Sequence, residues 1–441
     1  TYDDATSDNY TAPVFNEDED QTRWFYFLSN GKKVKAENGD DQKERTINGR
    51  RYAFDENGAM VAEWSLDVDE VFTGSSSNIR VTDGYDVSDL TTSTNAASKS
   101  AVRTQIAKYS QQWRYFSDVE DGARISRGWF KVVPAEYLDQ NVYDDDEENW
   151  YYADGSGKLY AGEFKTINGK KFAFRNDGRC IFGLKFIREE NDALDVRADD
   201  DGQWAFDDED AFNENAPLYE ADGYHAYYFG ETGDAPTDGA MRTGRQTISI
   251  GGDNFTFYFE TSGGKKGQGV TGEQDDRYYQ SGKLLAAGSD ERYQVVQRIE
   301  TLYTGGENYG KNDINGNPLM SDSYDILEDV EEFVDTVNAL TATDGIRARE
   351  VTLSGYQAKD DMGDKLGISN LNKKAEDLDE LYVLETQKAD GTWSTGIDTD
   401  DFFLVNTSGR VVDNKGKSKD GNDYYFVTGS NGEILAIYLE D

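Results

Sequence analysis

Cysteine and histidine are nearly absent from this chain of 441 residues, which contains one of each, Cys180 and His225. A single cysteine cannot form an intrachain disulfide, and one cysteine with one histidine supplies too few ligands for a zinc site. A nucleophilic triad needs a positioned base, usually histidine, but His225 lies in an aromatic strand without a cysteine or paired carboxylate nearby. We expect both residues to be structural, with Cys180 as a buried apolar filler.

Basic residues are scarce relative to acidic ones: 45 Lys and Arg stand against 87 Asp and Glu, a formal net charge of −42. This balance argues against nucleic acid and anionic membranes as partners, because both require basic side chains that meet phosphates. The sequence also lacks a run of about 18 apolar residues, so no membrane insertion is expected. The chain starts at Thr1 without a signal segment, which fits a mature or trimmed protein.

Aromatic residues and glycine, in contrast, are abundant, with 28 Tyr, 22 Phe, 7 Trp and 44 Gly. Disordered chains contain few aromatic residues, so this composition argues against disorder. A polar chain of this kind concentrates its apolar surface in a few bulky side chains. Many small cores are therefore expected in place of one large core.

Internal repeats account for these aromatic residues. Residues 46–64 read TINGRRYAFDENGAMVAEW, and residues 166–184 read TINGKKFAFRNDGRCIFGL, with Cys180 at the position of Met60. A related unit begins at Trp24 and again at Trp150, each with a glycine seven residues later. Looser copies begin at Trp113, Tyr227, Phe255, Tyr278, Phe402 and Tyr424.

Each repeat has the pattern of a β-hairpin. Tyr52 and Phe54 fall on one face of a strand and Ala53 on the other, residues 55–58 (DENG) are typical of a turn, and residues 59–61 form the returning strand. An isolated two-stranded hairpin is marginally stable in water, so successive hairpins must stack and bury their aromatic rings against each other. The sequence therefore predicts an all-β fold of tandem β-hairpin repeats in an elongated solenoid-like array, with one or two helical insertions.

Two segments interrupt the repeats. Apolar residues at helical spacing predict one helix over residues 96–111 and a second over residues 323–340, the latter with an acidic first turn. We accordingly predict four segments: hairpin repeats over 1–190, degenerate hairpin repeats over 191–300, a helix-containing spacer or small α/β domain over 301–395, and C-terminal hairpin repeats over 396–441.

The repeats resemble the cell-wall-binding (choline-binding-like) repeats of Gram-positive bacterial surface proteins. That family has a loose pattern of Gly-Trp, a short loop, Trp-Tyr-Tyr-Phe, a turn with glycine, and Thr-Gly; residues 128–162 match it best. The TINGK sequence at Thr166 is also similar to glucan-binding repeats and to toxin repeats. The resemblance covers about two thirds of the chain. It implies a secreted protein associated with the cell wall.

In that family, choline lies in an aromatic cage between consecutive hairpins, where cation–π attraction favours a quaternary ammonium. The resemblance therefore implies a ligand site at Trp129, Trp150 and Tyr152, and another at Trp24, Trp64 and Tyr52. This sequence departs from the pattern at Glu63, Leu184 and Arg245, where the family has glycine or tryptophan, so most cages would be incomplete. The same rings could equally form hairpin core, or stack on a sugar.

These observations favour a non-catalytic cell-surface protein that binds choline-bearing teichoic acid or another wall glycan. Two alternatives stay open. One is a structural scaffold or adhesin without a small ligand, which could bind a host surface ligand, and the other is the accessory region of a wall hydrolase whose catalytic domain lies outside this chain. Repeats leave no room for a catalytic barrel, so no enzyme is expected, although carboxylates for glycoside hydrolysis occur throughout.

No resident cofactor is expected beyond choline or sugar as ligand. Two acidic loops, residues 144–148 and residues 199–201, could hold Ca²⁺ through carboxylate oxygens. Neither loop fits the EF-hand pattern. We interpret both as solvated loops.

Overall fold

The computed structural model describes residues 23–37, 40, 42–66, 103–104, 106–135, 147–197, 199–200, 203–204, 206–231 and 235–441. The chain divides into two compact units. Unit 1 comprises residues 1–204 and 228–242, and unit 2 comprises residues 205–227 and 243–441. The division falls inside the segment predicted as degenerate hairpin repeats, and the short strand β13 (His225–Tyr228) lies where the two units meet in the sequence.

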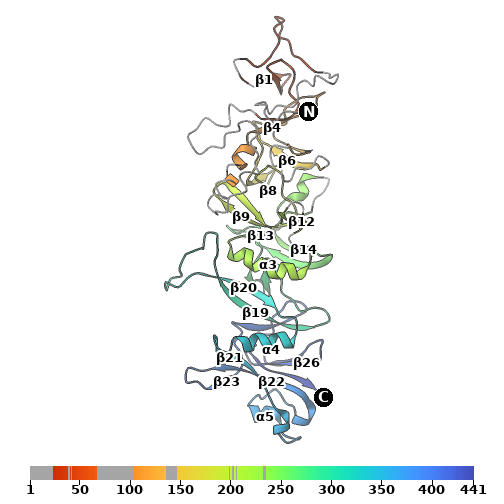
Figure 1. Ribbon diagram of the computed structural model, residues 1–441. Helices are drawn as coiled ribbons and strands as arrows, with labels where there is room; N and C mark the ends of the chain where they lie inside the picture. Colours follow the sequence, from red (N-terminus) through yellow and green to blue (C-terminus); the bar gives the residue numbers. More distant parts are fainter. Residues whose placement is uncertain are drawn as a thin grey trace. The chain divides into compact units, whose positions relative to one another are not determined.

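Unit 1 consists mainly of two-stranded antiparallel sheets, each a separate pair of short strands (Figure 1). The pairs are β1 (Gln42–Ile47) with β2 (Arg50–Asp55), β3 (Glu63–Leu66) with β4 (Trp113–Phe116), β5 (Gly128–Val132) with β6 (Asn149–Ala153), and β7 (Glu163–Ile167) with β8 (Lys170–Phe174). Next come β9 (Leu184–Glu190) with β10 (Ala193–Arg197), which are two strands of a three-stranded sheet, and β11 (Asp199–Asp200) with β12 (Gln203–Trp204). A 3₁₀ turn lies at Pro236–Gly239.

The two faces of these hairpins alternate as the sequence predicts. On β5 and β6, Phe130 and Tyr151 face one way, and they pack in a cluster with Trp113 and with the partly buried Trp64. Trp129 faces the other way and packs in a second cluster with Phe172 and Phe174 of β8. The hairpin β5–β6 thus buries one face against the hairpin before it and the other against the hairpin after it.

A five-residue turn recurs in both units. In residues 154–158, the carboxylate Oδ1 of Asp154 accepts hydrogen bonds from the backbone N–H groups of Ser156, at 2.7 Å, and Lys158, at 2.9 Å. Gly157 has a φ of +85°, which glycine adopts without a Cβ penalty. The same pair of hydrogen bonds recurs at turns beginning with Asp313, Asn406 and Asp420. The same turn chemistry therefore occurs at four places in the described part of the chain.

Unit 2 contains larger sheets. The first has the strand order β14 (Gly244–Ile250), β15 (Asp253–Phe259), β18 (Lys283–Leu284), β17 (Tyr278–Gln280) and β16 (Gly272–Glu273). A three-stranded sheet has the order β20 (Met320–Ile326), β19 (Tyr293–Leu302) and β24 (Phe402–Asn406). The third follows β21 (Ile346–Glu350), β22 (Leu378–Gln387), β27 (Ile434–Glu440), β26 (Tyr424–Thr428) and β25 (Gly416–Lys419), with β23 (Trp393–Thr395) also paired to β22.

The third sheet joins strands that lie far apart in the sequence. β22 comes from the segment predicted as a spacer, and β27 comes from the predicted C-terminal hairpins. Helix α4 (Val330–Ala339) contributes Phe333 and Val337 to the buried cluster that also contains Phe402 and Ile437. The spacer and the C-terminal hairpins thus share a core.

Of the two predicted helices, the first is confirmed over the part that the structure describes, since residues 103, 104 and 106–110 are helical. The predicted helix over residues 323–340 is too long: it begins at Val330, with Asp329 as N-cap accepting a hydrogen bond from the backbone N–H of Glu332. Residues 320–326 form strand β20 instead, because they complete the antiparallel pairing with β19.

Two helices in the described part of the chain were not predicted. Helix α3 (Glu209–Ala221) contains Pro217, which argues against a helix in the sequence, yet Asp208 caps it and Phe212 is buried against Phe257. Helix α5 (Met362–Leu366) is one short turn that ends at Gly367 in the left-handed conformation, and single 3₁₀ turns lie at Leu353–Gly355 and Ala375–Asp377. The described residues still confirm the predicted class, an all-β fold of antiparallel hairpins with few helices.

Candidate functional site

The structure brings together one of the two predicted sets of ligand residues. Trp129 lies on β5 opposite Tyr152 on β6, and Trp150 projects from the same face of β6. All three are half-buried and pack against one cluster with Tyr160, Phe172 and Phe174. We call these six residues the aromatic cluster; it lies between the hairpins β5–β6 and β7–β8.

Within the aromatic cluster the rings are in direct contact. The ring centroids of Trp129 and Tyr152 lie 5.1 Å apart in an edge-to-face arrangement, and those of Trp129 and Phe172 lie 4.9 Å apart. Tyr152 stacks on Tyr160, with centroids 5.1 Å apart and an interplanar angle of 10°. Such contacts stabilise the packing of the two hairpins. A ligand would therefore meet the outer ring faces and edges of the cluster.

A cation of the chain itself already lies on this aromatic cluster. The Nζ atom of Lys165 lies 5.1 Å from the centroid of the Tyr160 ring, and 2.8 Å from Oε2 of Glu163. A tyrosine phenol is neutral at physiological pH, and burial raises the pKa of Tyr160 further above its ordinary value. The face of Tyr160 is therefore electronically suited to a cation, and Glu163 adds a carboxylate beside it.

Tyr160 and Lys165 were not among the predicted site residues. The hairpin pattern of the sequence contained a signal for both residues. Tyr160 lies on the segment that returns beside β6, where its backbone N–H donates to the carbonyl of Tyr152, at 3.0 Å. Lys165 follows on β7, where it faces the same side as Phe172. Alternation along the strands could have placed both residues on this face.

The second predicted set, Trp24, Trp64 and Tyr52, is not joined by any ring contact among the described residues. Trp64 packs edge-to-face on Trp113 and Tyr151, and its Nε1–H donates to the carbonyl of Val133, at 2.8 Å. Trp24 is 50% exposed, and Tyr52 is half-buried on β2. Trp64 is thus part of the core between its own hairpin, β3–β4, and β5–β6.

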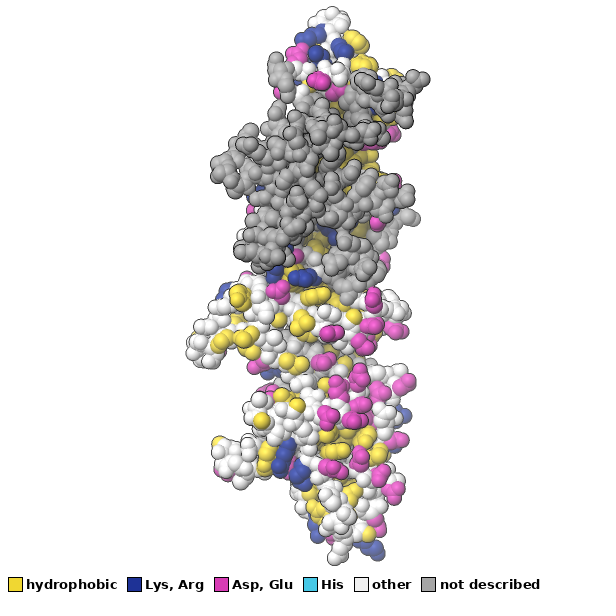
Figure 2. Space-filling model, viewed as in Figure 1, with side chains coloured by type: hydrophobic (Ala, Val, Ile, Leu, Met, Phe, Trp, Pro, Cys, Tyr) yellow, Lys and Arg dark blue, Asp and Glu magenta, His cyan; other side chains and the backbone are white. Residues whose placement is uncertain are grey.

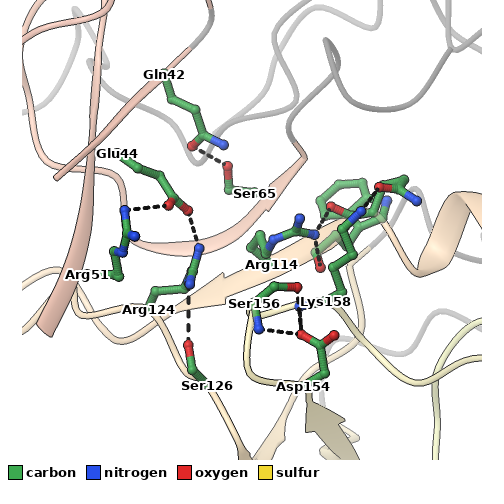
Figure 3. A network of polar contacts seen from close by, with 12 residues as sticks. Gln42, Glu44, Arg51, Ser65, Arg114, Arg124, Ser126, Asp154, Ser156 and Lys158 are labelled. Atoms are coloured by element: carbon green, nitrogen blue, oxygen red, sulfur yellow. Dashed lines mark hydrogen bonds and ion pairs between the residues drawn. The ribbon is translucent and has the colours of Figure 1, made fainter. Parts of the chain in front are cut away.

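A polar network fastens the hairpins near this second set (Figure 3). Arg124 lies between strands, where its guanidinium pairs with Glu44 and its backbone N–H donates to the carbonyl of Arg51, at 2.8 Å. Ser65 donates to Oε1 of Gln42, at 2.9 Å. These polar contacts join β1–β2 to β3–β4. The carboxylate of Glu44 is neutralised by the guanidinium of Arg124. The arrangement is structural.

The remaining candidate residues are Cys180 and those of the two acidic loops. Cys180 is buried, and burial raises the pKa of its thiol well above the usual range, which makes it unreactive at neutral pH. The acidic residues 144–146 and 201 lie outside the described residues. Among the residues that the structure describes, no group of three or more His, Cys, Asp or Glu side chains is arranged to hold a metal ion.

Acidic side chains gather on unit 2 over α3 and α4 (Figure 2). A pocket of about 780 Å³ there includes Glu209, Glu214, Asp325, Glu328 and Glu332 in its lining. The buried ammonium of Lys283 forms an ion pair with Glu209 of this lining and donates a hydrogen bond to Oδ1 of Asn213. None of the described helices is long and apolar enough to span a membrane.

Comparison with known proteins gives distant structural likenesses. No family model and no curated protein sequence matches the chain. The choline binding protein F of Streptococcus pneumoniae is 14% identical, over 60% of this chain and 56% of that protein, with a TM-score of 0.30. The modular autolysin LytC of the same species is 15% identical, over 64% of this chain and 39% of that one, with a TM-score of 0.25.

CbpJ of Streptococcus pneumoniae is 14% identical over 94% of this chain and 97% of its own length, with a TM-score of 0.28. The match thus spans less than two thirds of choline binding protein F and of LytC, and nearly the whole of CbpJ. At these identities and TM-scores, function has to be argued from the residues of this chain.

Proposed function

We propose that this chain is a non-catalytic, cell-surface binding protein that attaches to a cell-wall polymer through aromatic side chains between hairpins. The observation that carries the proposal is the aromatic cluster, where Trp129, Trp150 and Tyr152 meet on one face and a lysine ammonium lies over the neighbouring Tyr160. The contact shows that the Tyr160 ring face has room for an ammonium group. Choline on a wall teichoic acid is therefore the ligand that we favour.

Sugar rings are the second ligand that the cluster could take. Flat aromatic rings stack on the apolar face of a sugar without needing a positive charge, and Trp129 and Trp150 are only half-buried. Choline and glycan binding both place the protein outside the cell, in contact with the wall. The acidic charge of −42 further favours a cationic ligand group over an anionic one.

The first test is a choline titration followed by tryptophan fluorescence. Choline should quench the fluorescence saturably, and Trp129→Ala or Trp150→Ala should abolish the response. Trp393→Ala is the matched control, because Trp393 lies under the Arg347 guanidinium in unit 2 and should leave the response intact. An unchanged signal in the unmodified protein would exclude choline and leave the glycan or scaffold alternatives.

Retention on purified Gram-positive cell walls, with and without teichoic acid, separates those alternatives. Teichoic acid binding predicts retention only on the complete walls, whereas glycan binding predicts retention on both preparations. A scaffold or adhesin without a wall ligand would be retained on neither. Release of reducing sugars or muropeptides from the walls would contradict the non-catalytic role.

A further inference from the structure

A second pocket in unit 2 is unrelated to the aromatic cluster. The pocket has a volume of about 650 Å³. Its walls come from the end of α3, from the loop between β15 and β16, and from residues 303–319 between β19 and β20, which we call the arm. Small-molecule sites in proteins have volumes of about 300–1,000 Å³. The only histidine of the chain, His225, lies in its lining.

Backbone contacts hold the walls of this pocket in place. The N–H of Thr304 donates to the carbonyl of Ala221, at 2.8 Å, and fastens the arm to the end of α3. A Cβ atom added at Gly223 would overlap the Cα of Gly306, so only glycine permits this approach. The N–H of Gly269 donates to the carbonyl of Ala226, at 2.8 Å, and fixes the facing loop. The pocket is therefore preformed.

Carboxyl groups dominate the chemistry of the lining. The lining contains four carboxyl groups, those of Glu220, Glu260, Glu307 and Asp322, and one lysine, Lys265. Glu220 accepts a hydrogen bond from Thr271, at 2.7 Å, and another from Gln280, at 2.9 Å, and Asp322 pairs with Arg298 at 2.9 Å. Glu260 and Glu307 have no such pairing within the described part of the chain, so their oxygens can accept hydrogen bonds from a ligand.

We infer that this pocket binds a small ligand that carries a primary ammonium and hydroxyl groups, the chemistry of an amino sugar. Ionised carboxylates only accept hydrogen bonds, so the ligand has to donate them to Glu260 and Glu307. The excess of these two carboxylates over Lys265 favours a positive charge on the ligand. A quaternary ammonium has no N–H to donate and needs aromatic faces. Among the described lining residues, Tyr303 supplies the one phenol ring.

Calorimetric titration with glucosamine, glucose and choline tests this assignment. Glucosamine should bind saturably and more tightly than glucose, which offers the same hydroxyls without the ammonium. Glu260→Gln and Glu307→Gln should each weaken glucosamine binding at least about fivefold, because each removes a charge-assisted hydrogen bond. Choline should not displace glucosamine.

Glu214→Gln is the control, because it removes one exposed carboxylate from α3, the helix whose end contributes to the pocket, at a position outside the pocket lining. An equal loss in Glu214→Gln would show attraction by the overall acidic charge and would overturn the assignment, as would absence of saturable glucosamine binding. Circular dichroism of each variant shows whether it remains folded. Trp129→Ala should leave glucosamine binding unchanged, so failure of the choline site and failure of this pocket are distinguishable.

Discussion

At the scale of single residues, Lys165 shows how the chain can modulate its own aromatic cluster. Its ammonium lies on the Tyr160 ring and pairs with Glu163, so a ligand cation at that ring face has to compete with it. An exposed cation–π contact contributes about 0.5–1 kcal/mol. Removal of the lysine charge would also leave Glu163 free to attract a ligand.

We therefore expect Lys165→Met to tighten choline binding by about two- to fivefold, which is the ratio that corresponds to the lost cation–π contact. Fluorescence titration of the variant beside the unmodified protein measures the change. Lys170→Met removes the same charge from an exposed position on the same hairpin and should leave the affinity unchanged. Weaker binding in Lys165→Met would show that the lysine assists the ligand and does not compete with it.

Glu220 is the residue whose protonation should affect stability near neutral pH. Burial raises its pKa to about 7, although Thr271, Gln280 and Ser281 donate hydrogen bonds and Lys265 lies near. The folded state therefore keeps a proton between pH 4.5, the ordinary value, and pH 7, where the unfolded state has lost it. Stability from this group is present at low pH and is lost as the pH rises through this window.

Glu220→Gln should consequently reduce the fall in melting temperature between pH 5 and pH 8, because the amide keeps one donor and acceptor but has no proton to lose. Thermal melts of both proteins across this pH range give the difference, in which contributions from other groups cancel. A melting temperature with the same pH dependence in both proteins would mean that Glu220 titrates normally.

At the scale of elements, the unit of stability in unit 1 is the interface between hairpins. β5–β6 buries Phe130 and Tyr151 on one face and packs Trp129 against Phe172 and Phe174 on the other. A two-stranded sheet with two buried faces depends on both neighbours, since an isolated hairpin is marginally stable. Loss of one large ring at such an interface should therefore destabilise unit 1 strongly.

Phe172→Ala should lower the free energy of unfolding by about 3–5 kcal/mol, because Phe172 is almost completely buried between β5–β6 and β7–β8. Denaturant titration followed by circular dichroism measures this loss. Phe27→Ala, at a ring that is 58% exposed, should cost less than about 1 kcal/mol. Equal losses in the two variants would show that the hairpin interface does not determine stability.

At the scale of the whole molecule, the excess of acidic residues sets the response to salt. A formal net charge of −42 destabilises the compact state through self-repulsion, which dissolved ions screen over a Debye length of about 10 Å at 0.1 M. The ion pairs found at the surface, such as Arg298 with Asp322, contribute little in comparison.

We expect the melting temperature to rise as sodium chloride is added from low ionic strength, because screened repulsion outweighs the weakened surface ion pairs. Calorimetric scans at increasing salt concentration test this expectation, with sodium chloride preferred to sulfate because sulfate also strengthens hydrophobic burial. A melting temperature that falls with salt would show that ion pairs dominate the electrostatics.

Several features followed from the sequence because they depend on neighbouring residues. Turn chemistry such as that of residues 154–158 is local, and strand alternation assigned Trp129 and Phe130 to opposite faces. The scarcity of cysteine and histidine likewise excludes an intrachain disulfide and a zinc site on composition alone. The all-β hairpin class and the first helix followed from these patterns.

Only the tertiary structure decided which rings meet and which segments share a core. Contacts such as Tyr152 with Tyr160, Lys165 with Tyr160, and β22 with β27 join residues whose proximity depends on packing between separate elements. Helix α3 formed in spite of Pro217 because Phe212 is buried against Phe257. Sequence periodicity describes one element at a time, whereas burial is a property of two elements together.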